Sequence, residues 1–267
     1  WGIAVLVFLM LPIVTIVVYG FNSGRVLVVW EGASLQPFLD AFSQPAMRSA
    51  VITSLKAAVA SAALATVVGL FAGIYLARHG GRLAAAFVAL LALVLVTPEI
   101  VNGISLLIWF VRVGGPFGPD WGSDYGLARL AVGHAIFSTA VVSLIVRARL
   151  SGVDSSLEEA AADLYAPPIR RFRQITLPLL APSLLAAFVL SFSLSLDNTI
   201  ISSFVSVAGS SPWPVFVLSA VRGTLRPEVA AMSAVLLLFT LVALGLVLLT
   251  LRRSGRDSDV VRTFAGG

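Results

Sequence analysis

The sequence predicts an all-α integral membrane protein with six transmembrane helices. Hydrophobic residues make up 58% of its 267 residues, and only 12% are charged. A soluble domain carries roughly twice that charged fraction. The mean hydropathy of +0.99 agrees with a membrane protein. The apolar residues form six runs, each able to cross ~30 Å of hydrocarbon as a helix. We therefore expect one transmembrane domain over residues 1–267, without a large domain outside the membrane.

The six predicted spans are residues 1–21, 50–77, 84–111, 126–148, 178–203 and 229–251. The first reads "WGIAVLVFLMLPIVTIVVYGF". No basic residue precedes it and no small-residue cleavage site follows, so we interpret it as a span and not as a signal peptide. We expect its basic flank to lie outside this sequence. The second span is rich in alanine and glycine, which favours close packing inside the bundle.

Polar residues interrupt three of the later spans. Glu99 follows Pro98 inside the third span, and Asp197 and Asn198 lie inside the fifth. Acids at membrane depth are costly and face a cavity or a partner. His134 lies in the fourth span, where we interpret it as a hydrogen-bond partner between helices.

The arginines predict the orientation of the chain. Cytoplasmic segments carry an excess of basic residues, so both termini are predicted to be cytoplasmic. With that orientation the inner segments hold Arg78, Arg82, Arg147, Arg149, Arg170, Arg171, Arg173, Arg252, Arg253, Arg256 and Arg262. The outer segments hold Arg25, Arg48, Arg112, Arg222 and Arg226. The formal charge of +5 therefore indicates membrane topology and not nucleic-acid binding.

The loop at 150–177 is the longest polar insert and contains "EEAAADLYAPPIRRFRQITLPL". Ser155 or Ser156 is a candidate N-cap for a short helix beginning near Leu157. Proline disfavours helix in the residue before it, so the helix should end before Pro167 and Pro168, and a second helix should begin at Pro168. An interfacial amphipathic loop is one interpretation. An acidic helix, a forced turn and a basic helix in that order favour a docking element.

Several classes of function are disfavoured by the sequence. It has no cysteine, which rules out disulfides, thiolate catalysis and cysteine metal sites. Two distant histidines predict no metal site, so we expect no catalytic residues and no metal ligands. No H-E-x-x-H, G-x-S-x-G or G-x-x-x-x-G-K-[ST] motif occurs. We therefore predict that the chain is not an enzyme and does not hydrolyse ATP through a phosphate loop.

The polar loop resembles the EAA signature of ABC importer permeases, E-A-A-x-x-x-G followed by a spacer and I-x-L-P. Glu159, Ala160 and Ala161 match its opening, and Ile175 to Pro178 match its close. Tyr165 stands where the family has glycine, so either the turn is strained or it adopts another conformation. The segments "WEGASLQPFLDAF", "TPEIVNGISLL", "LSLDNTIISSFV" and "GTLRPEVAAMSAVLLL" are similar to the spermidine/putrescine, PotC-like branch of that family. The resemblance covers about nine-tenths of the chain.

The resemblance implies the type I permease fold of ABC importers, with a coupling helix between spans four and five. It implies that the loop docks on a cytoplasmic ATPase through Glu158, Glu159, Ala160, Ala161, Asp163, Tyr165, Arg170 and Arg171. It also implies a dimer of ATPase subunits that binds ATP and Mg, with no cofactor on this chain. It further implies a second, distinct permease and an extracytoplasmic binding protein as partners. The importer is expected in the cytoplasmic membrane of a bacterium, in contact with membrane lipid.

The expected function is uptake of polyamines, with Glu99, Asn102, Asp197 and Asn198 along the translocation path. The branch often reads "LDD" where this chain has Asp197-Asn198, which weakens the inference to a polycation. The same importer type for γ-aminobutyrate, ferric iron, a phosphonate or an opine stays open. A secondary transporter fits less well, because such folds show internal repeats and more spans.

Overall fold

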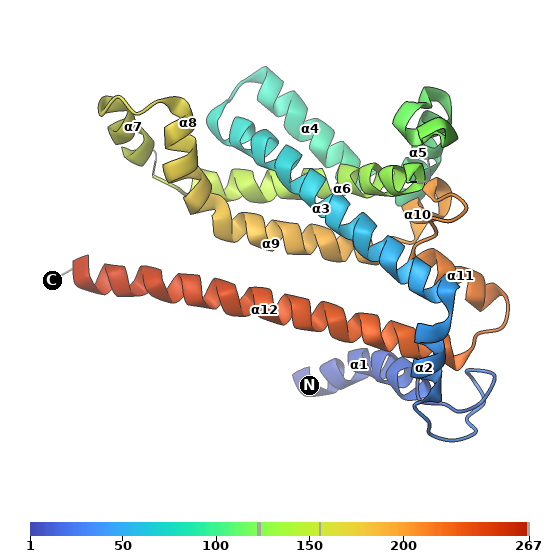
Figure 1. Ribbon diagram of the computed structural model, residues 1–267. Helices are drawn as coiled ribbons and strands as arrows, with labels where there is room; N and C mark the ends of the chain where they lie inside the picture. Colours follow the sequence, from blue (N-terminus) through green and yellow to red (C-terminus); the bar gives the residue numbers. More distant parts are fainter. Residues whose placement is uncertain (122–123, 155, 266–267) are drawn as a thin grey trace.

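The computed structural model describes residues 1–121, 124–154 and 156–265, and helices account for most of them (Figure 1). In chain order the elements are α1 (Gly2–Tyr19), α2 (Gln36–Ser43), α3 (Pro45–Arg78), α4 (Arg82–Val96), α5 (Glu99–Val113), η1 (Gly115–Phe117), η2 (Pro119–Trp121), α6 (Tyr125–Ser151), α7 (Ser156–Asp163), α8 (Pro168–Arg171), η3 (Phe172–Thr176), α9 (Leu177–Leu196), α10 (Ile200–Val205), α11 (Trp213–Arg222) and α12 (Pro227–Ala265).

Helix α3 forms the centre of the packing. It lies along α6 and α9, and the three helices run side by side in Figure 1. An apolar cluster fills the space between them and includes the buried side chains of Val142, Val146 and Leu180. Several alanines of α3 are buried, among them Ala62 and Ala65, in line with the small-residue composition of the span.

Two glycines set how closely α3 approaches α6. A Cβ atom at Gly69 would lie 2.6 Å from Val142 Cβ, and one at Gly73 would lie 2.6 Å from Val146 Cβ. Both separations are shorter than Cβ contacts found in proteins. Lipid supplies no hydrophobic drive between helices, so the pair is held by van der Waals contact at short range.

The predicted third span is two helices in the structure. The chain bends by 104° between α4 and α5. The break falls at Thr97, whose backbone is extended (φ −63°, ψ 129°), and at Pro98. Proline lacks an N–H donor and disfavours helix in the residue before it, which accounts for the position of the bend. The bend makes Glu99 the first residue of α5.

The predicted fifth span is also divided. Helix α9 ends at Leu196, and α10 begins at Ile200 after a break that contains Asp197 and Asn198. No proline lies at this break. The Asn198 side chain accepts a hydrogen bond from the Ile201 N–H at 3.0 Å. Such a local side-chain bond offers the backbone an alternative to continuing the helix.

Helices α1 and α12 lie apart from the α3–α6–α9 group over much of their length. Helix α1 packs against α12, and none of its residues is buried. Helix α12 ends toward the end of the bundle that carries α7 and α8, whereas the N-terminus lies about halfway along α12 (Figure 1).

The predicted all-helical membrane fold is confirmed. In the part of the chain that the structure describes, five helices are long and apolar enough to cross a membrane: α1, α3, α6, the continuous helix at 168–196, and α12 as far as Leu246. The bent α4–α5 pair makes a sixth candidate span.

The close approach of α3 and α6 predicts that Gly73→Ala destabilises the bundle. The added methyl group has no space against Val146, and overpacking of this kind costs about 1–3 kcal/mol. Thermal unfolding of the detergent-purified chain measures the loss. Gly80→Ala is the matched control, because a Cβ there would have no neighbour within 4 Å. Equal melting temperatures for the two variants would contradict the close packing.

Candidate functional site

The loop between α6 and α9 folds into two short helices, α7 and α8, joined by a tight turn. The Asp154 carboxylate accepts a hydrogen bond from the Ser156 N–H at 2.9 Å, and this bond lowers the pKa of Asp154. Of the two predicted N-cap residues, Ser155 lies outside the described residues and Ser156 is the first residue of α7. Pro168 begins α8, where its missing N–H costs nothing.

Tyr165 takes the left-handed conformation, at the position where the EAA signature has glycine. Its φ is +57°, and among the described residues it is the one non-glycine with positive φ. The Ala166 N–H donates to Ala161 O at 3.0 Å, and the Tyr165 N–H donates to Ala162 O at 2.9 Å. These two bonds define a Schellman turn, with tyrosine at the position usually held by glycine. The conformation costs tyrosine about 1–2 kcal/mol.

The turn presents an apolar surface to solvent. Leu164 is 82% exposed, Tyr165 94% and Ile169 74%. The charged side chains around this surface are exposed as well, namely Glu159, Asp163 and Arg170. Of the other predicted docking residues, Ala160 is exposed, Ala161 and Arg171 are half-buried, and Glu158 is half-buried for a separate reason.

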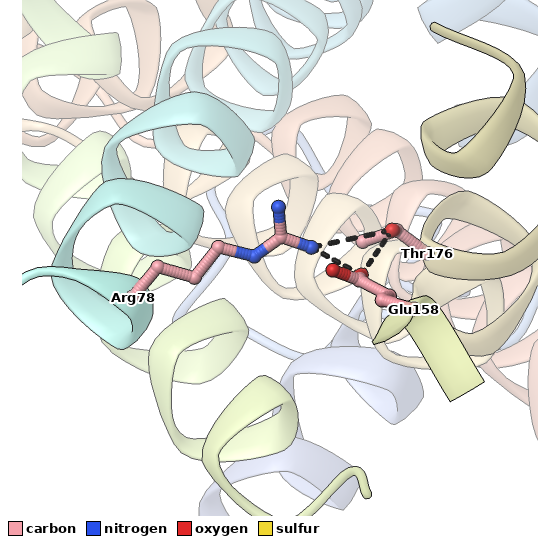
Figure 2. A network of polar contacts seen from close by, with 3 residues as sticks. All are labelled: Arg78, Glu158 and Thr176. Carbon is pink, nitrogen blue, oxygen red and sulfur yellow. Dashed lines mark hydrogen bonds and ion pairs between the residues drawn. The ribbon is translucent and has the colours of Figure 1, made fainter. Parts of the chain in front are cut away.

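Glu158 is held inside the chain by Arg78 and Thr176 (Figure 2). The Arg78 guanidinium, at the end of α3, pairs with Glu158 Oε1. The Thr176 hydroxyl donates to the same oxygen at 2.5 Å and lies 3.4 Å from an Arg78 nitrogen. We call these three residues the latch. It ties α7 to the end of α3 and to the start of α9.

The latch fixes the position of α7 but adds little to the free energy of unfolding. The Arg78 side chain is 41% exposed and that of Glu158 is 26% exposed. Ion pairs of this exposure contribute about 0.2–1 kcal/mol, because water and salt screen them. Thr176 is buried and ends η3, a π-helical segment that runs directly into α9. The latch therefore joins α7, through a side-chain contact, to a residue whose backbone is continuous with α9.

A second group of polar residues surrounds a cavity of about 190 Å³ deeper in the bundle. Its lining includes Glu99 from α5, Asp197 and Asn198 from the α9–α10 break, and His134 and Ser138 from α6. Three of the four predicted path residues thus converge, because the bend at Pro98 and the break after Leu196 bring their helix ends together. Two carboxylates and an amide oxygen around one cavity form a setting for a cation.

The fourth predicted path residue, Asn102, lies in a neighbouring cavity of about 360 Å³. This second cavity is largely apolar and is lined by residues that include Trp109, Ile136 and Ile201. Phe137 lines both cavities. The four residues are therefore adjacent but do not share one site.

Sequence reasoning did not identify three side chains that shape these two sites. Arg78 is predicted only as a topology marker, and Thr176 carries no signal beyond its place in the I-x-L-P segment. His134 is correctly interpreted as a partner between helices, but nothing in the pattern places it beside Asp197. In the described part of the chain, no group of three or more His, Cys, Asp and Glu residues is arranged to hold a metal ion.

Comparison with known proteins identifies a family for this chain. The family described as "binding-protein-dependent transport system inner membrane component" matches residues 65–254. The putrescine transport system permease protein PotI of Escherichia coli strain K12 is 37% identical over 242 residues, which cover 89% of this chain and 85% of PotI. The spermidine/putrescine permease protein PotC of Haemophilus influenzae is 33% identical, with 92% and 93% covered.

Solved structures agree on the fold. A bacterial ABC transporter that imports the acidic polysaccharide alginate matches with a TM-score of 0.74, covering 94% of this chain and 92% of that chain at 13% identity. The MetNI methionine ABC transporter matches with a TM-score of 0.55 at 22% identity, covering 80% and 98%. At these identities the likeness concerns the fold alone.

The latch predicts that Glu158→Gln loosens the α7–α8 segment. Loss of a contact worth up to about 1 kcal/mol raises the open population by up to about fivefold. Trypsin cleavage after the exposed Arg170, followed in vesicles that expose this loop, measures the change. Glu159→Gln is the matched control, because Glu159 is exposed and takes no part in the latch. The latch is refuted if both variants are cleaved at the wild-type rate.

Proposed function

This chain belongs to the family of binding-protein-dependent transport system inner membrane components, and we propose that it forms one half of a pore that imports polyamines. Membership makes the chain a transport subunit and a multi-pass inner-membrane protein. Members of this family are transport subunits, so the chain is not an enzyme. The substrate is the part that we propose, and the names of PotI and PotC support it.

The cavity at Glu99, Asp197 and Asn198 carries the substrate proposal. Polyamines are flexible chains with several ammonium groups, and each ammonium group seeks carboxylate or amide oxygens. The cavity of about 190 Å³ would receive an ammonium group between these side chains. Asn102, in the neighbouring cavity, would offer a further amide oxygen along the path.

The surface around Tyr165 supports a docking role for the loop. Leu164, Tyr165 and Ile169 expose apolar area, and exposed apolar area ringed by charge is typical of a protein interface. We propose that an ATPase subunit receives this surface, with Glu159, Asp163, Arg170 and Arg171 contacting its rim. ATP and Mg would be bound by a dimer of that subunit, and not by this chain.

The latch supplies a route from the ATPase to the pore. Closure of the ATPase dimer on ATP would move α7, and the latch would carry that movement to α3 and α9. Helix α9 ends at the break beside Asp197. Movement of the loop would thus change the geometry of the cavity, opening it first to the outside and then to the cytoplasm.

The opposite end of the bundle offers a shaped loop for a binding protein. Asn22 is fully buried there. Its amide nitrogen donates to Val29 O at 2.6 Å, and its side-chain oxygen accepts from the N–H groups of Gly24 and Glu31. These bonds fix the loop at 22–34, which we propose contacts an extracytoplasmic substrate-binding protein. The loop with α7 and α8 would then be cytoplasmic, as would both termini.

A second permease would complete the pore. Helix α1 buries none of its apolar residues within the chain, and six spans are few for a pore. We propose that a related but distinct permease and membrane lipid cover α1. Import of γ-aminobutyrate, ferric iron, a phosphonate or an opine by the same architecture is the alternative. A secondary transporter leaves the docking surface without a role.

The docking proposal predicts that Glu159→Lys uncouples the importer. Reversal of charge at the exposed rim should weaken ATPase docking by about tenfold, equivalent to about 1.4 kcal/mol. Uptake and ATP hydrolysis in vesicles carrying the full importer should both fall. Glu31→Lys, a charge reversal in the loop at the opposite end, is the control for assembly alone and should co-purify with the ATPase as the wild type does. Normal coupling in Glu159→Lys would refute docking through this surface.

The substrate proposal predicts that Asp197→Asn slows polyamine uptake more than it slows ATP hydrolysis. The variant removes the charge but keeps a side chain of similar size. Thermal shift of the cognate binding protein identifies the substrate independently: putrescine or spermidine should stabilise it, whereas γ-aminobutyrate, ferric iron and a phosphonate should not. Stabilisation by an anion alone would end the polyamine proposal.

A further inference from the structure

His134 joins the two sides of the α9–α10 break. The side chain is buried, with 3% of the residue exposed. Its Nδ1 atom lies 2.6 Å from Ser195 Oγ on α9, and its Nε2 atom lies 2.9 Å from Ser202 Oγ on α10. The two serines stand on either side of Asp197 and Asn198. One side chain from α6 therefore bridges the break between α9 and α10 beside the cavity.

The break raises two separate requirements, partners for its freed backbone groups and a fixed position of α10 relative to α9. The backbone groups freed at a break lose their helical partners, and within a membrane no solvent replaces them unless they face a cavity. On the α10 side, the Asn198 side chain satisfies the Ile201 N–H. That bond lies within the chain segment after the break and does not fix α10 relative to α9. The contacts of His134 do so.

We propose that His134 is a positioning residue of the translocation path, which holds Asp197 and Asn198 toward the cavity by bridging Ser195 and Ser202. The proposal rests on the transport function proposed above. His134 also lines the cavity itself. Both of its ring nitrogens are bonded to serine hydroxyls, so neither is available to bind substrate. Its role is to keep the carboxylate of Asp197 in place while α9 moves.

The chemistry of the bridge specifies which replacement preserves it. A neutral imidazole donates from one ring nitrogen and accepts at the other, and a serine hydroxyl does either. Both bonds are therefore satisfied together in either tautomer. A glutamine amide also offers one donor group and one acceptor atom, so His134→Gln keeps the bridge chemically possible. His134→Leu has similar bulk and no polar atom.

The first experiment measures uptake and ATP hydrolysis in the same proteoliposomes, with the complete importer and radiolabelled putrescine. His134→Leu should lower putrescine imported per ATP hydrolysed by about tenfold, the effect of losing one to two hydrogen bonds. His134→Gln should restore most of that ratio. Ser143→Ala is the matched control, because the Ser143 hydroxyl bonds only Thr139 O of its own helix. A wild-type ratio in His134→Leu would overturn the proposal.

A second variant covers the case in which His134→Leu fails to assemble. His134→Leu combined with Ser195→Ala and Ser202→Ala removes all members of the bridge together, so no buried polar group loses its partner. This triple variant should assemble and still import poorly for each ATP hydrolysed. Recovery of both assembly and the wild-type ratio would mean that the bridge serves folding alone, and would overturn the proposal.

A reporter independent of substrate separates this proposal from the transport function. The sequence has no cysteine, so Leu194→Cys, in the cavity lining, provides a single label. A cationic methanethiosulfonate should modify the introduced thiol about tenfold faster in the His134→Leu background than in the wild-type or His134→Gln background. The reason is that loss of the bridge lets the break open more often. Equal rates would overturn the bridge. Absence of polyamine uptake by the wild type would refute the proposed substrate and leave this comparison unaffected.

Discussion

The contact among Arg78, Glu158 and Thr176 is the interaction on which the rest of the structure depends. It joins a polar loop to an apolar bundle at the point where α3 ends and α9 begins. The energy of the contact is small, because Arg78 and Glu158 are partly exposed. Its importance is geometric. Without it, α7 would connect to the membrane helices only through its neighbouring chain segments, whereas α8 is part of the continuous helix at 168–196.

Helix α9 extends this constraint through the membrane. Twenty residues span about 30 Å, so one helix connects the latch to the cavity. Thr176 precedes the start of the helix and Asp197 follows its last turn. At the far end, His134 attaches α9 and α10 to α6. The loop, the latch, α9 and the bridged break thus form one connected series of contacts between the two candidate sites.

The sequence predicts the helical membrane fold and the polar loop because both follow from composition and local pattern. Pro98 marks the bend between α4 and α5, but its angle of 104° depends on packing with other helices. The break after Leu196 has no proline and is stabilised by His134, a residue more than sixty positions earlier, so no local pattern indicates it. Adjacent acids also look alike in sequence, although the fold turns Glu158 inward and leaves Glu159 exposed.

Tyr165 shows the same limit in a different way. A tyrosine in place of glycine is compatible either with a strained left-handed turn or with a different turn, and the structure has the left-handed turn. The Schellman hydrogen bonds at Ala161 and Ala162 hold it there. The exposed aromatic ring gives a physical reason to accept the backbone strain, since glycine would supply the turn but no apolar surface.

We propose that α7 moves together with the ends of α3 and α9, and a cross-link tests this most directly. The chain has no cysteine, so Arg78→Cys and Glu158→Cys together allow a short bismaleimide to replace the latch with a covalent bond. The complete importer should retain uptake and ATP hydrolysis after cross-linking, with the uncross-linked double variant showing weaker coupling. Loss of uptake on cross-linking would show that the loop must detach from the bundle, and would contradict the account.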